Sequence, residues 1–401
     1  QRTYKKILLF GLKICGGVIV ETNEIASKIS SNLDSEEMID FLFSLIETET
    51  VNPPGDEYLL HDIIMKSMKE IGAEVEILSK DEKRPNYIGR IGSGNPSVAI
   101  ISHTDVVPPG EGWTQHPFQP YEKDGKIYGR GALDNKGSLA ASWAGIKALL
   151  KSGLKFKGTI YFCAVSDEEM GSQFGAEYII EKGFKPDYAI VPDSGSIDKA
   201  IIGEKGAAWF DLESHGKQSH GSTPELGINA IIKVSKLISN FEKFDFNLKY
   251  DSRFTPPTIN VGMVSGGNAP NIVASRCKVT LDVRYPVGIT ESMILKRITD
   301  EIDVLKSKDG DADIRLGEVT TRHFPHVIEQ NSKLTDTFKK TAQDIGIPLE
   351  FETSSGITVA KIFNLNGIPA IAHSPDSDNT WHISDEYVKI ENLEKCAVLW
   401  A

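Results

Sequence analysis

Short apolar segments alternate with helical segments through the first half of the chain. Of all the sequence features, this alternation most limits the folds that the chain can adopt. Apolar runs over 97–102, 159–165 and 188–191 predict buried strands. Segments with helical spacing over 136–152 and 176–182 separate them. Strands that alternate with helices are typical of an α/β fold, in which helices cover a mostly parallel sheet. We therefore expect an α/β domain with a mostly parallel sheet.

The strand pattern changes in the middle of the chain. Residues 206–322 alternate like antiparallel strands and enclose two helical segments, in the order strand, helix, strand, strand, helix, strand. This order is typical of a ferredoxin-like α+β domain, and the α/β pattern returns after it. We therefore expect a catalytic domain formed by 35–205 and 323–401, interrupted by an inserted domain over 206–322. Two domains also suit a chain of 401 residues.

An N-terminal extension over 1–34 precedes the first regular helical pattern. Lys5 and Lys6 come before an apolar stretch over 7–20, which Lys13 interrupts and which is too short for a membrane span. The stretch loosely resembles a secretory signal, but no small-residue cleavage site follows it. We expect an extension outside the main fold, no membrane partner and a cytoplasmic protein.

Charge and cysteine content argue against a nucleic-acid partner and against structural roles for the cysteines. The net charge of -12 argues against a nucleic-acid partner, because binding phosphates requires clustered Lys and Arg. Cys15, Cys163, Cys277 and Cys396 lie far apart and form no CxxC pair. We interpret them as reduced thiols rather than as a disulfide framework or a cysteine-based zinc site.

Polar side chains follow the predicted strands at the point where each strand ends. His103 and Asp105 come directly after the strand over 97–102 and, two residues apart on extended backbone, point the same way. One of them could bind a metal while the other orients the imidazole ring. Such a pair is equally compatible with a purely structural role. Asp193 follows the strand over 188–191 in the same manner.

Three further acids and a histidine are ambiguous when each is taken alone. Asp134 follows a glycine-rich turn and precedes a helix, so it could simply cap that helix. Glu168 and Glu169 lie in an acidic turn after a strand, which could be a solvated loop. His382 lies near the C-terminus, before the last helix. His373 is its rival, although the acid four residues after His382 favours His382.

Taken together, these side chains indicate a two-metal centre. Its candidate ligands are His103, Asp134, Glu169, Asp193 and His382. Four of them lie at or near the ends of predicted strands, where open α/β sheets bind ligands. Imidazoles and carboxylates suit zinc, cobalt or manganese, and two divalent ions with three carboxylates and one hydroxide make a neutral site, which burial tolerates. Glu168 then remains free to act as general base on a bridging water.

The motifs SHTD, GRGALDNKG, DEEMGS and VPDSG, followed by His382, are similar in order and spacing to the M20 family of metallopeptidases. The resemblance covers the chain from about Met38 to its end. It implies an amide hydrolase with two divalent ions, Zn²⁺ first and Co²⁺ or Mn²⁺ as alternatives. It also implies that the inserted domain is a lid, which commonly forms a homodimer.

The resemblance further implies a role for each metal ligand. His103 and Asp193 would bind one ion, and Glu169 and His382 would bind the other. Asp134 would bridge both ions, and family members often carry a cis peptide bond directly after this bridging residue. The bond between residues 134 and 135 is therefore a candidate for the cis form.

Other residues would take part in catalysis or bind substrate, according to the same resemblance. Asp105 would brace His103, and Glu168 would be the general acid and base. His220, in the segment SHGSTP, would polarise the scissile carbonyl. An Arg fork suits recognition of a substrate carboxylate. The implied substrate-binding residues are Asn271, Arg284 and Gly356.

The sequence thus predicts hydrolysis of an amide bond beside a free carboxylate. N-acyl amino acids are the favoured substrates, in a reaction of the desuccinylase or deacetylase type. Dipeptides, tripeptides or the C-termini of short peptides are the alternatives. Val359 stands where many relatives carry Asp, so the acyl group stays open. A non-catalytic protein that binds an amino-acid derivative is a remote alternative, which the presence of Glu168 opposes.

Overall fold

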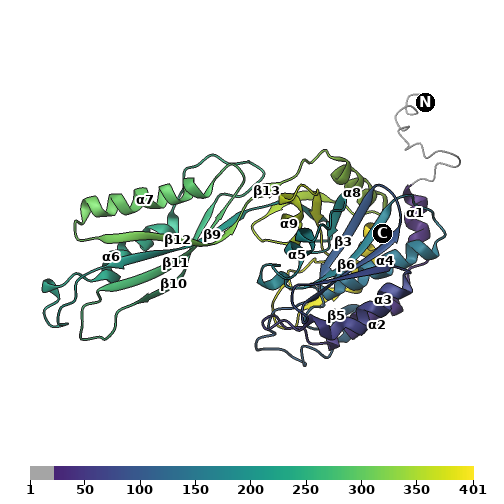
Figure 1. The fold of residues 1–401 in the computed structure, drawn as a ribbon, viewed down its shortest axis with the longest axis horizontal. Coiled ribbons are helices and arrows are strands. Elements are labelled where there is room, and N and C mark those ends of the chain that lie inside the picture. The colour runs from purple at the N-terminus through teal and green to yellow at the C-terminus, as the bar shows by residue number, and fades with distance from the viewer. Residues whose placement is uncertain (1–21) are drawn as a thin grey trace. The chain divides into compact units, whose positions relative to one another are not determined.

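Residues 22–401 are described by the computed structural model as two compact units (Figure 1). The first unit contains the described residues up to Asp198, together with Asn331–Glu350 and His373–Ala401. The second unit contains Lys199–Gln330 and Phe351–Ala372. No helix within residues 22–401 is long and apolar enough to cross a membrane.

A sheet with the strand order β1-β2-β6-β3-β7 runs through the first unit. The strands are β1 (Glu74–Ser79), β2 (Pro85–Gly92), β3 (Ser97–His103), β6 (Thr159–Val165) and β7 (Tyr188–Val191). β3 pairs in parallel with β6 and with β7, whereas β2 pairs antiparallel with β1 and with β6. The centre of the sheet is therefore parallel, which confirms the predicted α/β fold.

One buried helix organises the helices of the first unit. α4 (Lys136–Lys151) packs against β3, and both α2 (Ser35–Glu47) and α10 (Ile390–Trp400) pack against α4. The contact with α10 requires glycine, since a Cβ on Gly145 would lie 2.1 Å from the carbonyl oxygen of Ala397. The remaining helices are α1 (Thr22–Ser30), α3 (His61–Glu70), α5 (Ala176–Glu181) and α8 (Lys333–Asp344), with short 3-10 turns at Glu57–Leu60 and Glu168–Met170.

A small antiparallel sheet joins the C-terminal segment to the first half of the chain. Its strand order is β16-β5-β4, and its strands are β4 (Tyr121–Lys123), β5 (Lys126–Tyr128) and β16 (Tyr387–Lys389). Each strand has three residues, which is too short for an alternating pattern to reveal. Because β16 pairs with β5, this sheet fixes the end of the loop that carries His382.

The expected extension over 1–34 belongs partly to the fold. The possible secretory signal lies outside the described residues. Thr22–Ser30 forms α1, whose Ile29 is buried beside Ala148 and Leu149 of α4. Asp34 then caps α2, because its carboxylate accepts the N–H of Glu37 at 3.1 Å. Residues 24–34 therefore pack on the first unit instead of lying outside it, because α1 buries an apolar side chain there.

The second unit contains a four-stranded antiparallel sheet with the order β10-β11-β9-β12. The elements are β9 (Gly206–His215), α6 (Ala230–Ile238), β10 (Thr258–Gly266), β11 (Arg276–Tyr285), α7 (Glu291–Lys308) and β12 (Asp313–His323), with short 3-10 turns at Pro224–Leu226 and Ser239–Lys243. Alternate residues of β9 and β11, such as Phe210 and Leu281, enter one core with Val234 of α6 and Ile298 of α7. This order of strands and helices is the one expected for residues 206–322.

A second group of strands extends the second unit beyond those residues. β8 (Lys199–Glu204) pairs with β13 (His326–Val327), β14 (Glu350–Ser354) and β15 (Ala370–Ala372), and α9 (Val359–Leu365) packs on β15. Residues 351–372, which we had expected in the catalytic domain, therefore lie in the second unit. They belong to this unit because β14 and β15 pair with β8, a strand that lies far from them in the sequence.

Candidate metal centre

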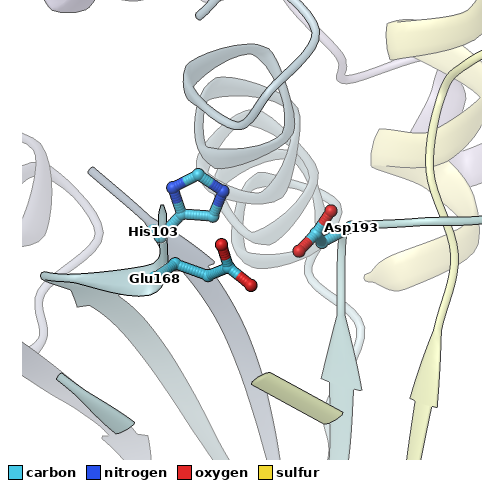
Figure 2. Close-up of side chains that lie close together, drawn as sticks. All are labelled: His103, Glu168 and Asp193. Carbon is cyan, nitrogen blue, oxygen red and sulfur yellow. The ribbon is translucent and has the colours of Figure 1, made fainter. Parts of the chain in front are cut away.

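Three candidate residues lie just beyond the carboxyl ends of the three parallel strands. His103 ends β3, Glu168 follows β6 after a tight turn, and Asp193 follows β7. One ligand atom of each lies within 4.8 Å of the others, and Figure 2 shows the three side chains converging. The carboxyl ends of neighbouring parallel strands meet at one edge of a sheet, which explains how the three segments come together.

Asp134 lies between two imidazoles at the start of α4. Its Oδ1 atom is 2.9 Å from Nε2 of His103, and its Oδ2 atom is 3.0 Å from Nε2 of His382. Nε2 of His382 also lies 3.3 Å from Oε2 of Glu169. The peptide bond between Asp134 and Asn135 is cis, as the resemblance implied. All five candidate ligands therefore lie in the first unit, and each contacts or lies close to another.

Asp105 joins the end of β3 to the acidic turn after β6. Its two carboxylate oxygens accept the backbone N–H groups of Glu168 and Glu169, each at 3.1 Å. It also accepts a hydrogen bond from the Asn52 side chain at 2.8 Å, and its Oδ1 lies 3.5 Å from Nδ1 of His103. Asp105 is fully buried, so these contacts orient both the histidine and the turn.

The electrostatics of the cluster reflect an excess of buried negative charge. Burial and the neighbouring Asp193 carboxylate raise the pKa of Glu168 well above its ordinary value. Burial and Asp134 likewise raise the pKa of Glu169. Hydrogen bonds to Asp134 and Glu169 raise the pKa of His382 to about 10. A site that pushes carboxylates toward protonation in this way favours a bound cation.

The donor set fits divalent metal ions. Two overlapping groups, which share His103, bring ligand atoms close enough to hold an ion: His103 with the neighbouring Glu168 and Asp193, and His103 with Asp134 and Glu169. Oε1 of Glu169 is buried and has no hydrogen-bond partner among the described residues, as expected of a ligand atom reserved for a metal. Imidazole nitrogens and carboxylate oxygens suit zinc and its neighbours in the first transition row.

His373, the rival of His382, lies elsewhere. It is fully buried, with Nε2 3.1 Å from the carbonyl oxygen of Ile197. Its Nδ1 atom accepts the indole N–H of Trp400 at 3.2 Å. Both ring nitrogens are therefore engaged in the core of the first unit, whereas the half-exposed His382 lies at the acidic cluster.

The four remaining candidate residues lie in the second unit. His220 and Asn271 are exposed, and Nδ1 of His220 lies 2.8 Å from the hydroxyl of Ser222. Arg284 is partly buried on β11 and donates to the Asp282 carboxylate at 2.9 Å. Gly356 is exposed in the loop before α9. Arg284 thus already has an anionic partner, which the sequence did not predict.

A buried arginine beneath the acidic turn was not predicted either. Arg84 donates two hydrogen bonds to Glu57, at 2.7 and 3.1 Å, and its Nη1 lies 3.0 Å from Oδ1 of Asp167. Gly55 makes room for it, since a Cβ there would lie 2.4 Å from the guanidinium carbon. The signal available in the sequence is the NPPG turn, which needs glycine at a positive φ of 78°.

A cluster of imidazoles and carboxylates at the ends of parallel strands defines the class of the protein as one with a candidate metal centre. The family model described as Peptidase family M20/M25/M40 matches residues 99–401, and the chain belongs to this family. Membership implies divalent metal ions and hydrolysis of amide bonds, so the chain is an enzyme of that kind.

Named relatives align with most of the chain. Succinyl-diaminopimelate desuccinylase of Zymomonas mobilis is 28% identical over 371 residues, which span 89% of this chain and 94% of the relative. The protein of that name from Wolbachia pipientis subsp. Culex pipiens is 30% identical and covers 89% of each chain. The fold is similar to that of a tripeptidase from Staphylococcus aureus, with a TM-score of 0.75, 22% identity, and coverage of 92% of this chain and 96% of that one.

Proposed function

We propose that the chain hydrolyses the amide bond of an N-acyl amino acid, with an N-succinyl amino acid as the first substrate to test. The placement of Asp134 between His103 and His382, with Glu168 and Asp193 close to His103, carries the hydrolytic part of this proposal. The succinyl group is suggested by the desuccinylases, which align with 89% of the chain. The tripeptidase likeness is the reason to test peptides in parallel.

We assign the metal ligands as follows. His103 and Asp193 would hold one divalent ion, Glu169 and His382 would hold the other, and Asp134 would contact both. Zn²⁺ is the first candidate, and Co²⁺ or Mn²⁺ are alternatives. When bound, such ions acidify water and polarise the carbonyl oxygen of a substrate.

Glu168 is the proton carrier in the proposed reaction. Its carboxylate takes a proton from the attacking water, whose oxygen adds to the amide carbonyl carbon. Glu168 then returns the proton to the amide nitrogen as the C–N bond breaks, which releases an amine and a carboxylic acid that loses its own proton to solvent. Asp105 orients the backbone of Glu168 throughout.

Four residues of the second unit are assigned roles in catalysis or substrate binding. We assign His220 to stabilise the oxyanion, Asn271 and Arg284 to bind the substrate carboxylate, and Gly356 to bind substrate. Arg284 would have to exchange its contact with Asp282 for the substrate, and the planar guanidinium can donate to either carboxylate.

We also propose that this unit forms a homodimer through its β10 edge, where Met263 and Val264 are exposed.

A substrate panel tests the proposal. The purified chain, loaded with Zn²⁺ or Co²⁺, is given N-succinyl and N-acetyl amino acids, dipeptides and tripeptides, and release of free amine is measured. Preference for an N-acyl compound supports the proposal, and preference for a peptide replaces it with a peptidase function. Binding of these compounds without any hydrolysis would instead indicate a non-catalytic protein.

A further inference from the structure

A single carboxylate holds the loop that carries Asp134. Glu386 is fully buried, and its Oε1 atom accepts the backbone N–H groups of Leu133 at 2.8 Å and Asp134 at 3.1 Å. Its Oε2 atom accepts the N–H of Gly131 at 3.2 Å and also contacts Arg130. Three backbone N–H groups of one turn thus converge on one side chain, which restrains the backbone at residue 134.

Arg130 connects the same loop to the segment around His382. It is 1% exposed, its Nη1 pairs with Glu386, and its Nη2 lies 3.3 Å from the carbonyl oxygen of His382. The same Nη2 lies 3.3 Å from the carbonyl oxygen of Pro109. Glu386 itself follows His382 by four residues. The ion pair therefore contacts both the loop that carries Asp134 and the loop that carries His382.

The two loops meet at the metal centre. Asp134 and His382 come from distant parts of the sequence, yet Oδ2 of the first lies 3.0 Å from Nε2 of the second. His382 has a positive φ of 58°, a backbone conformation that needs support from its surroundings. The ion pair supplies that support to the His382 carbonyl and to the Asp134 amide together.

We propose that Arg130 and Glu386 are positioning residues, which set the separation of Asp134 and His382 and thereby the affinity of the ion that these two side chains share. This inference rests on the metal ligands assigned in the proposed function. Neither residue is among the assigned metal ligands, so both would act through those ligands. Partners that orient metal ligands from behind typically change metal affinity by about 10- to 100-fold when they are replaced.

Metal binding without substrate tests this inference. Glu386→Gln keeps the size of the side chain but removes its charge, and Zn²⁺ binding to the metal-free variant is measured by calorimetry and by competition with a chelator. We expect both ions to bind more weakly, because Asp134 would contact both, with the larger loss, about 10- to 100-fold, at the ion that His382 shares. The matched control is Glu391→Gln, on the surface of α10, where both affinities should be unchanged.

Two outcomes would overturn the positioning role. One is wild-type affinity for both ions in folded Glu386→Gln, and the other is a loss at the ion of His103 and Asp193 that equals or exceeds the loss at the ion of His382. If Glu386→Gln does not fold, Arg130→Lys provides the second test, because it keeps the positive charge but loses the link to the His382 carbonyl. Weakening that is largest at the ion of His382 is again expected, and unchanged binding would refute the inference.

The readout separates this inference from the proposed reaction. A wild-type chain that binds two ions yet hydrolyses no amide in the substrate panel would refute the proposed function alone. The effect of Glu386→Gln on metal affinity would still be measurable in that protein. Conversely, an active enzyme whose metal affinities are unchanged by substitution of Arg130 and Glu386 would refute only the positioning role.

Discussion

The Nε2 atom of His382 lies 3.0 Å from Oδ2 of Asp134, while the other oxygen of the same carboxylate is 2.9 Å from His103. Asp134 therefore contacts both histidines with separate oxygens. This arrangement suits a carboxylate that contacts two ions at once. It also means that any shift of the Asp134 backbone changes the contacts to both imidazoles, so the support of this loop matters for the whole centre.

The adjacent acids Glu168 and Glu169 are expected to have different roles. Glu168→Ala should keep both metal ions and reduce kcat by about 10²- to 10⁴-fold, because it removes the proton carrier and no ligand. Glu169→Ala should lose one ion, because Glu169 contacts His382 and has an unpartnered buried oxygen among the described residues. Metal analysis and amine release measure the two effects. Retention of both ions in Glu169→Ala with loss of metal in Glu168→Ala would reverse the assignment.

His382 is expected to hold one ion only. His382→Ala should bind one equivalent of Zn²⁺ as tightly as the wild type and the second much more weakly, since the imidazole lies at Asp134 and Glu169. A chelator titration followed by metal analysis measures both affinities. His116→Ala is the control, because His116 is an exposed loop histidine. Two tightly bound ions in His382→Ala would remove this residue from the ligand set.

Arg84 is expected to stabilise the fold by compensating buried acids. Arg84→Met leaves Glu57 and Asp167 buried without their guanidinium partner, and we expect the free energy of unfolding to fall by about 3–5 kcal/mol. Urea denaturation measures the change. Arg90→Met is the matched control, since Arg90 forms an exposed pair with Glu74 and should matter far less. Equal effects of the two substitutions would mean that burial does not strengthen the Arg84 contacts.

Local pattern was enough to predict the strands that carry the candidate site. The apolar runs before His103, Glu168 and Asp193 are strands in the structure, because a buried parallel strand needs a continuous apolar segment and a polar break at its end. The inserted βαββαβ order was visible for the same reason, since β9 and β11 alternate clearly. Such periodic signals depend only on neighbouring residues.

Contacts between distant segments could not be predicted in this way. Nothing local shows that Arg84 meets Glu57, or that Glu386 accepts the N–H groups of the loop at Asp134. The acid four residues after His382 was noticed, but its partners depend on how two loops are brought together. Residues 351–372 lie in the second unit for a similar reason, because pairing with β8 is set by tertiary structure.

Acid should destabilise the protein partly through His373. Burial lowers the pKa of His373 to about 4, and the indole N–H of Trp400 occupies its Nδ1 atom, so the folded state resists a second proton. The unfolded chain accepts that proton near pH 6.5. Between these values the unfolded state binds more protons, so the free energy of unfolding falls as pH drops from about 6.5 to about 4, by on the order of 3 kcal/mol.

His373→Gln should therefore flatten the pH dependence of stability, whatever constant change it causes at neutral pH. Urea denaturation from pH 7 to pH 4, with a chelator present so that metal loss does not contribute, compares its slope with that of the wild type. Part of the slope should remain, because burial also lowers the pKa of His326 to about 3. His116→Gln, on an exposed loop, should keep the full wild-type slope. A wild-type slope in His373→Gln would mean that the folded state accepts the proton at residue 373 as readily as the unfolded chain.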